Sequence, residues 1–112
     1  MYKIYGIPNC NTVKKALTHL DNKGLEYEFI NFKKQAPTKS LIKDWKDAFG
    51  DWPVNKKGPT YRKIKEEFEN AKAPEKYKLL EVTTSAIKRP ILTKNEKVIH
   101  FGYDDAVYNE LT

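Results

Sequence analysis

The first 32 residues contain a strand, a helix and a second strand, and this pattern constrains the fold more than any other part of the sequence. Residues 2–7 carry apolar side chains on both faces, with Ile4 on one and Tyr5 on the other, which predicts a strand covered on both sides. Apolar residues then recur at helical spacing over 13–20, and a second strand follows over 26–32. Such a unit implies a right-handed crossover and a parallel strand pair.

The middle of the chain, residues 38–85, is predicted to be helical throughout. Thr38 is a candidate N-cap for a helix that ends at Gly50, Thr60 can cap a second helix, and Pro74 begins a third. The buried stripe of the first of these helices is expected to consist of Leu41, Ile42, Trp45, Ala48 and Phe49. Trp45 and Trp52 are expected to pack within this helical part of a single domain that covers residues 1–112.

The last part of the chain predicts a strand pair and a closing helix. Residues 89–93 and 97–101 form two strands joined by a turn, Gly102 breaks the second strand, and Asp104 or Asp105 starts the helix. The order of elements is therefore βαβ, helices, ββα. This order indicates an α/β thioredoxin-like fold, with a mixed four-stranded sheet and a helical insert over about 38–85.

The net charge of the chain and its distribution indicate which classes of partner the protein can bind. The formal net charge is +6, from 21 Lys and Arg against 15 Asp and Glu, but acidic residues separate the basic clusters, which form no long basic block. This pattern favours anionic small molecules or an acidic protein partner over nucleic acid. No apolar run reaches the ~18 residues that a membrane-spanning helix needs, and no secretory signal is visible, so no membrane association is expected.

The single cysteine, Cys10, cannot pair within the chain, which indicates a reducing compartment and hence the cytoplasm. His, Cys, Asp and Glu residues show no metal-ligand spacing, so neither a metal site nor a bound cofactor is expected. Cys10 lies where the first strand passes into the helix, and its thiol is expected to face unpaired backbone N–H groups at the positive end of the helix dipole.

Both features of that position favour the thiolate, which is the nucleophilic form of cysteine. The alternative is that Cys10 is a small buried apolar residue, as free cysteines often are. The polar neighbours argue for the reactive interpretation; they are Asn9, Asn11, Thr12, Lys14 and Lys15.

Three segments in order resemble the motifs of the arsenate reductase-like (ArsC/Spx-type) family. They are IYGIPNCNT at 4–12, KGPTYRK at 57–63 and IKRPI at 87–91, and the family's closing strand and turn are matched by FGY at 101–103. The resemblance covers essentially the whole chain. It also agrees with the thioredoxin-like order of elements.

In arsenate reductases of this type, a cysteine thiolate attacks the oxyanion, glutathione attacks the adduct, and glutaredoxin completes the reduction. The resemblance implies that Cys10 is the nucleophile and that Arg62 and Arg89 contact the oxyanion, because a guanidinium presents a fork of donors to such a group. The remaining candidate anion-binding residues are Asn9, Asn11 and Thr12. A third family arginine has no counterpart, since Phe101 and His100 stand in its neighbourhood, and this weakens the case for arsenate.

Related proteins use a Cys-x-x-Cys pair as a redox switch, but Val13 occupies the second position here. Any oxidised form must therefore be a mixed disulfide or a sulfenic acid, and turnover requires an external thiol. Glutathione or another low-molecular-weight thiol is the expected co-substrate, with a glutaredoxin-like protein as partner. The resemblance also implies a cis Arg89–Pro90 bond, with Pro90 positioning the thiol substrate and Arg89 directed toward Cys10.

Three functions follow from these residues. The first is a thiol oxidoreductase that uses an external thiol and reduces arsenate or a related oxyanion. The second is a domain that binds a small thiol without rapid catalysis. The third is an Spx-type regulator of RNA polymerase, but that class carries the Cys-x-x-Cys switch and a longer basic C-terminus.

We expect the first of these functions. Two of the residues discussed also have simpler interpretations. Arg62 can pair with Glu66 on a solvated helix face, and His19 is expected to face solvent.

Overall fold

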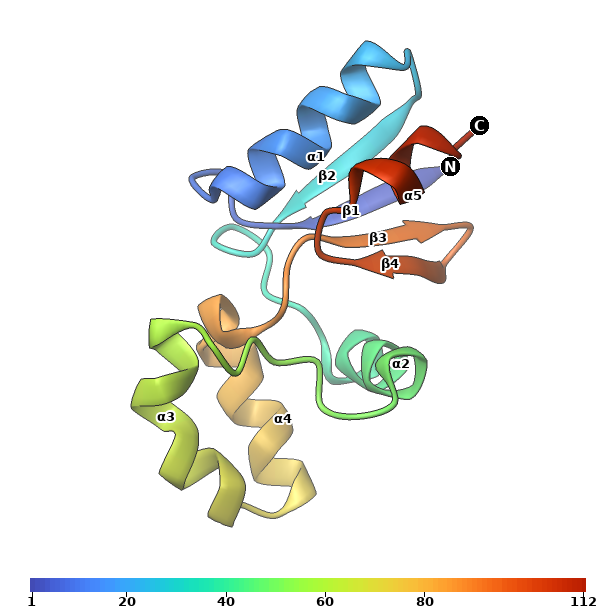
Figure 1. Cartoon of the computed structure of the whole chain (residues 1–112). Helices are drawn as coiled ribbons and strands as arrows, with labels where there is room; N and C mark the ends of the chain where they lie inside the picture. The colour runs from blue at the N-terminus through green and yellow to red at the C-terminus, as the bar shows by residue number, and fades with distance from the viewer. The chain divides into compact units, whose positions relative to one another are not determined.

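The computed structural model describes all 112 residues, which divide into two compact units (Figure 1). The first unit consists of residues 1–32 and 89–112, and the second of residues 33–88. None of the helices is long and apolar enough to cross a membrane.

The first unit is built on one sheet with the strand order β2-β1-β3-β4. Strand β1 is parallel to β2 and antiparallel to β3, and β3 is antiparallel to β4, so the predicted mixed four-stranded sheet is confirmed. The strands are β1 (Tyr2–Gly6), β2 (Tyr27–Asn31), β3 (Ile91–Lys94) and β4 (Lys97–Phe101). The turn between β3 and β4 places Asn95 and Glu96 at positive φ.

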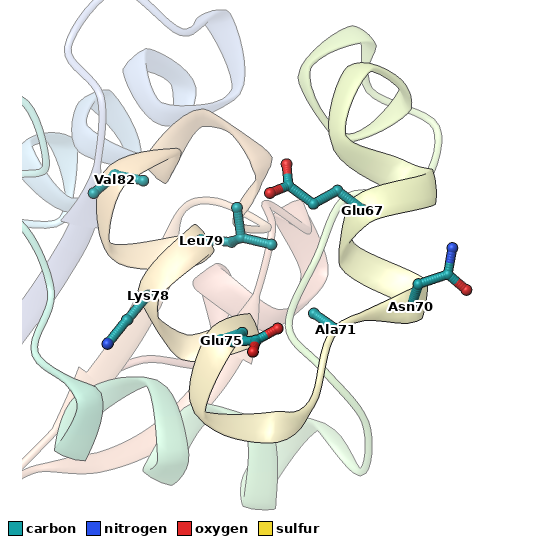
Figure 2. A pocket seen from close by; sticks show the side chains of 7 residues that line it. All are labelled: Glu67, Asn70, Ala71, Glu75, Lys78, Leu79 and Val82. Carbon is teal, nitrogen blue, oxygen red and sulfur yellow. The ribbon is translucent and has the colours of Figure 1, made fainter.

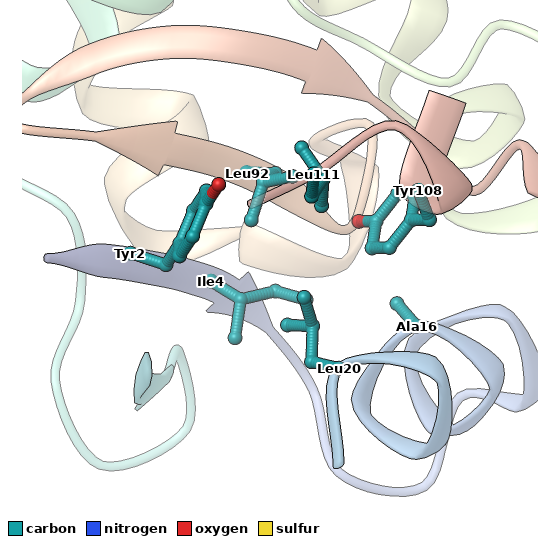
Figure 3. Packing of buried hydrophobic residues seen from close by; sticks show 7 residues of the cluster. All are labelled: Tyr2, Ile4, Ala16, Leu20, Leu92, Tyr108 and Leu111. Atoms are coloured by element: carbon teal, nitrogen blue, oxygen red, sulfur yellow. The ribbon is translucent and has the colours of Figure 1, made fainter. Parts of the chain in front are cut away.

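Two helices of this unit, α1 (Asn11–Asn22) and α5 (Asp105–Asn109), share one hydrophobic cluster with β1 and β3 (Figure 3). The cluster consists of Tyr2, Ile4, Ala16, Leu20, Leu92, Tyr108 and Leu111. Both helices therefore cover the same face of the sheet. The predicted final helix is confirmed, and Asp104 caps it by accepting from the N–H of Ala106 at 2.9 Å.

The second unit contains three α-helices and a short 3₁₀ helix: α2 (Lys39–Phe49), α3 (Pro59–Asn70), α4 (Ala73–Val82) and η1 (Thr84–Ala86). The Thr38 cap is confirmed, because its hydroxyl accepts from the N–H of Leu41 at 3.2 Å. The Thr60 cap is wrong. Helix α3 begins two residues earlier than that cap implies, with Gly58 as its N-cap and Pro59 at its first position, where a missing N–H costs no hydrogen bond.

The predicted stripe of α2 is partly wrong, since only Ile42 and Trp45 are buried. Ala48 and Phe49 lie exposed in the last turn, and the Lys88 ammonium lies 5.8 Å from the centre of the Phe49 ring. Trp52 packs within this unit as expected, with ring centroids 5.7 Å from Phe68 and 4.8 Å from Tyr77. The aromatic packing of the insert is therefore confirmed.

Gly6, at the end of β1, allows α1 to lie unusually close to the sheet. A Cβ atom at this position would meet Cγ2 of Val13 at 2.8 Å, a separation that real side chains do not adopt. Val13 belongs to the first turn of α1 and is fully buried. The N–H of Phe32 also donates to the Gly6 carbonyl at 2.9 Å. Absence of a side chain here thus sets the start of α1 and the loop that carries Cys10.

We predict that Gly6→Ala lowers the free energy of unfolding by about 1–3 kcal/mol, because the buried Val13 side chain must move to admit the new methyl group. Urea unfolding followed by circular dichroism measures the change. The matched control is Val13→Ala, which removes the atoms that clash. The double variant is expected to lose less than the sum of the two single losses, and strict additivity would contradict the proposed cause.

Candidate functional site

Cys10 is the N-cap residue of α1, as the strand-to-helix position predicted. Its backbone is extended, with φ −100° and ψ 125°, and its side chain is half-buried. The Cys10 N–H donates to the carbonyl of Ile7 at 3.3 Å, and the N–H of Lys14 donates to the Cys10 carbonyl at 2.9 Å. These bonds fix the loop on one side of the sulfur and the helix on the other.

The environment of the sulfur favours its ionised form. Burial by itself raises the pKa of the Cys10 thiol, but the amides of Val13 and Thr12 and the guanidinium of Arg89 outweigh it, so the pKa lies below its ordinary value. The side chain does not form a conventional capping hydrogen bond, so the two amides act on the thiolate as nearby oriented dipoles. Arg89 contributes both a hydrogen bond to the sulfur and its positive charge.

Arg89 and Pro90 lie where the chain enters β3. The Arg89–Pro90 peptide bond is cis, as the resemblance implied. Pro90 is fully buried, and its carbonyl accepts from the N–H of Gly102 at 2.7 Å. Arg89 itself is half-buried beside Cys10. The structure therefore brings Cys10 and Arg89 together, while the roles of both arginine and proline in binding a substrate stay predictions.

The other predicted anion-binding residues are exposed. Asn9 lies in the turn before Cys10, and Asn11 and Thr12 are the first two residues of α1. Arg62 lies exposed on α3 in the second unit, and it forms no ion pair with Glu66. Its place in a site with Cys10 stays a prediction.

His19 is not solvated as expected, because α5 packs beside the face of α1 that carries it. Its side chain is only 11% exposed. Its Nδ1 lies 2.7 Å from the Tyr103 hydroxyl and 3.6 Å from a carboxylate oxygen of Asp105, and its Nε2 lies 2.8 Å from Oδ1 of Asn109. The periodicity of α1 could not predict this burial, because it depends on residues that lie more than 80 positions later in the sequence.

Sequence reasoning also missed a hollow of about 750 Å³ between α1 and α5. It begins at Asn11, directly after the cysteine, and continues along α1 to Lys23. We call it the α1–α5 groove; its lining consists of Asn11, Lys14, Lys15, Thr18, His19, Asn22, Lys23, Tyr103, Asp105 and Asn109. The only signal in the sequence was the pair of lysines that follows Cys10.

Another hollow, of about 540 Å³, lies between α3 and α4 of the second unit (Figure 2). Leu79 and Val82 supply apolar surface there, and Glu67 and Glu75 add carboxylates. It contains none of the predicted site residues. No group of three or more His, Cys, Asp or Glu side chains is placed to hold a metal ion.

We predict that the alkylation rate of Cys10 by iodoacetamide rises with pH at a midpoint below that of a cysteine in an unfolded peptide, because the folded protein stabilises the thiolate. Arg89→Gln removes the charge and is expected to move the midpoint upward. Arg89→Lys keeps the charge and serves as the matched variant, with a smaller upward change. A midpoint equal to that of the urea-unfolded protein would contradict this account.

Comparison with known proteins places the fold and the site in context. The model of the ArsC family matches residues 5–111. An uncharacterised protein of Haemophilus influenzae is 30% identical over 110 residues, which cover 96% of each chain. Among solved structures, a possible arsenate reductase of Streptococcus mutans is 32% identical with a TM-score of 0.76, over 92% of this chain and 91% of that one.

A second solved structure, a protein named YFFB, is 29% identical with a TM-score of 0.85, over 97% of this chain and 96% of that one. The predicted α/β thioredoxin-like fold is thereby confirmed. With a family match over nearly its whole length, the mixed sheet and one cysteine at the start of α1, the chain belongs to the ArsC family.

Proposed function

We propose that this protein is a thiol oxidoreductase that uses Cys10 as its nucleophile and takes electrons from an external thiol of the glutathione type. The observation that carries the proposal is the sulfur at the start of α1, which Arg89 and the amides of Thr12 and Val13 hold toward the thiolate state. A half-buried sulfur whose pKa is lowered by a neighbouring guanidinium and two amides can attack an electrophile and remain reachable by a second thiol.

The proposed reaction has two exchange steps. In the first, the Cys10 thiolate attacks the glutathione sulfur of a mixed disulfide between glutathione and a target protein, and the target leaves as a thiolate. In the second, a glutathione thiolate attacks the Cys10–glutathione disulfide, which releases glutathione disulfide and restores the Cys10 thiolate. Each step forms one S–S bond and breaks one, and glutathione is oxidised as the target thiol is restored.

The chain requires this external second step because it has one cysteine. Val13 occupies the position of a resolving cysteine, and its side chain is fully buried against Gly6. A glutaredoxin-like protein can replace glutathione as the resolving thiol. The reducing cytoplasm is the compartment that would supply either of them.

Arsenate is the substrate in the name of the S. mutans relative, and we propose it as a second candidate. The specific observation in its favour is the Arg89 guanidinium beside the sulfur, since such a fork suits a tetrahedral oxyanion. The neighbourhood of the missing third arginine holds half-buried His100 and Phe101, which cannot present the same fork. We therefore rank disulfide exchange above arsenate reduction.

The test compares the purified protein on a glutathionylated peptide and on arsenate, with glutathione and glutathione reductase coupled to loss of NADPH absorbance, and with a glutaredoxin added to the arsenate assay and to its control without the protein. Cys10→Ser is expected to reduce the rate on the favoured substrate to background, because a hydroxyl cannot replace the thiolate. Arg89→Gln is expected to lower the rate about tenfold at neutral pH, because it removes a charged hydrogen bond to the sulfur.

Circular dichroism checks that both variants fold. Full activity in Cys10→Ser would overturn the mechanism. Stoichiometric formation of the Cys10–glutathione disulfide without turnover would instead show a thiol-binding domain, and a rate on arsenate alone would reverse our ranking of substrates.

A further inference from the structure

The α1–α5 groove begins at the residue that follows Cys10 but takes no part in the reaction described above. Its volume of about 750 Å³ falls within the range of sites that bind small molecules. It begins at Asn11, next to Cys10, and ends near Lys23, at the last turn of α1. An occupant of the groove would therefore lie along α1, with one end at the start of the helix that Cys10 caps.

The charge in the groove is positive on balance. Lys14, Lys15 and Lys23 line it, and neither Lys14 nor Lys15 forms an ion pair. Asp105 is the one carboxylate in the lining, and protein groups already occupy both of its oxygens: the Tyr103 hydroxyl donates at 3.2 Å and the Asn109 amide at 3.1 Å. The lysines next to the cysteine are thus available to an anionic partner.

The neutral part of the lining suits a peptide backbone. Asn11 and Asn22 each offer an amide donor and a carbonyl acceptor, and Thr18 offers a hydroxyl, all from exposed positions on α1. Extended peptide chains present alternating N–H and C=O groups, which such side chains can pair. An aliphatic or aromatic ligand would leave these groups without partners.

The length of the groove favours an extended segment of a protein over a tripeptide such as glutathione as its anionic occupant. The helix rises about 1.5 Å per residue, so Asn11 and Lys23 lie about 18 Å apart along its axis. An extended chain covers about 3.3 Å per residue, so a tripeptide such as glutathione spans about 10 Å and leaves much of the groove empty. A segment of five or six residues fits the whole length.

We propose that the α1–α5 groove docks an extended acidic segment of the target protein, next to the cysteine that exchanges at Cys10. This inference rests on the proposed function, because the target protein is the substrate of the exchange at Cys10. Binding of the segment itself does not require that exchange to occur. The pKa of the Cys10 thiol is shifted by burial, the Val13 amide, Arg89 and the Thr12 amide. The two lysines can therefore be neutralised without altering the nucleophile.

Binding is tested with the Cys10→Ser protein and a fluorescein-labelled hexapeptide that carries alternating glutamates, by anisotropy at low and moderate salt. We expect saturable binding that weakens with salt and falls about tenfold or more in Lys14→Gln/Lys15→Gln. The matched control is Lys63→Gln/Lys65→Gln, which removes two exposed lysines from α3 and is expected to bind as the parent does. Equal affinity for a glutamine version of the peptide, or an equal loss in both double variants, would overturn the proposal.

The second experiment separates docking from the chemistry of Cys10. With wild-type cysteine, Lys14→Gln/Lys15→Gln is expected to raise KM about tenfold for a glutathionylated acidic peptide, and to leave the rate unchanged on a mixed disulfide between glutathione and a small uncharged thiol. A KM that does not change for the acidic peptide would refute docking. Failure of exchange on every disulfide, with salt-dependent peptide binding intact, would refute the proposed function and leave the docking site supported.

Discussion

The contact between Gly6 and Val13 is the constraint on which the rest of the site depends. It lets the first turn of α1 approach the end of β1 more closely than any side chain would allow. The loop between them is short, and Cys10 is the N-cap residue of the helix. A helix start is where backbone amides lack partners, so the position of the sulfur and its electrostatic environment have the same cause.

The state of that sulfur is a balance of opposed effects. Partial burial disfavours the charge, and two amides and one guanidinium favour it more strongly. Arg89 comes from the far end of the sequence, at the entry to β3, so the balance depends on the antiparallel pairing of β3 with β1. Cys10 and Arg89 belong to the same compact unit, which lets that unit by itself hold the thiolate.

Local patterns predicted most of the fold. Neighbouring residues alone determine strand alternation, helix periodicity and the caps at Thr38 and Asp104. The cap at Thr60 failed because proline at the preceding position, Pro59, is itself favoured as the first residue of a helix. The position of Cys10 at the start of a helix was also predictable from local sequence, whereas Arg89 beside it was expected only from the resemblance to the family. His19 and the α1–α5 groove were not, since both depend on α5 packing against α1.

Helix α5 has only five residues, too few to persist alone in water. Its hold on α1 comes from the buried Tyr108 and from the bonds of His19 to Tyr103 and Asn109. One wall of the groove therefore exists only while this short helix is docked. A molecule that binds the groove stabilises the docked state of α5 and so makes its local opening rarer. The backbone amides of residues 105–109 would then exchange with deuterium more slowly when the groove is occupied.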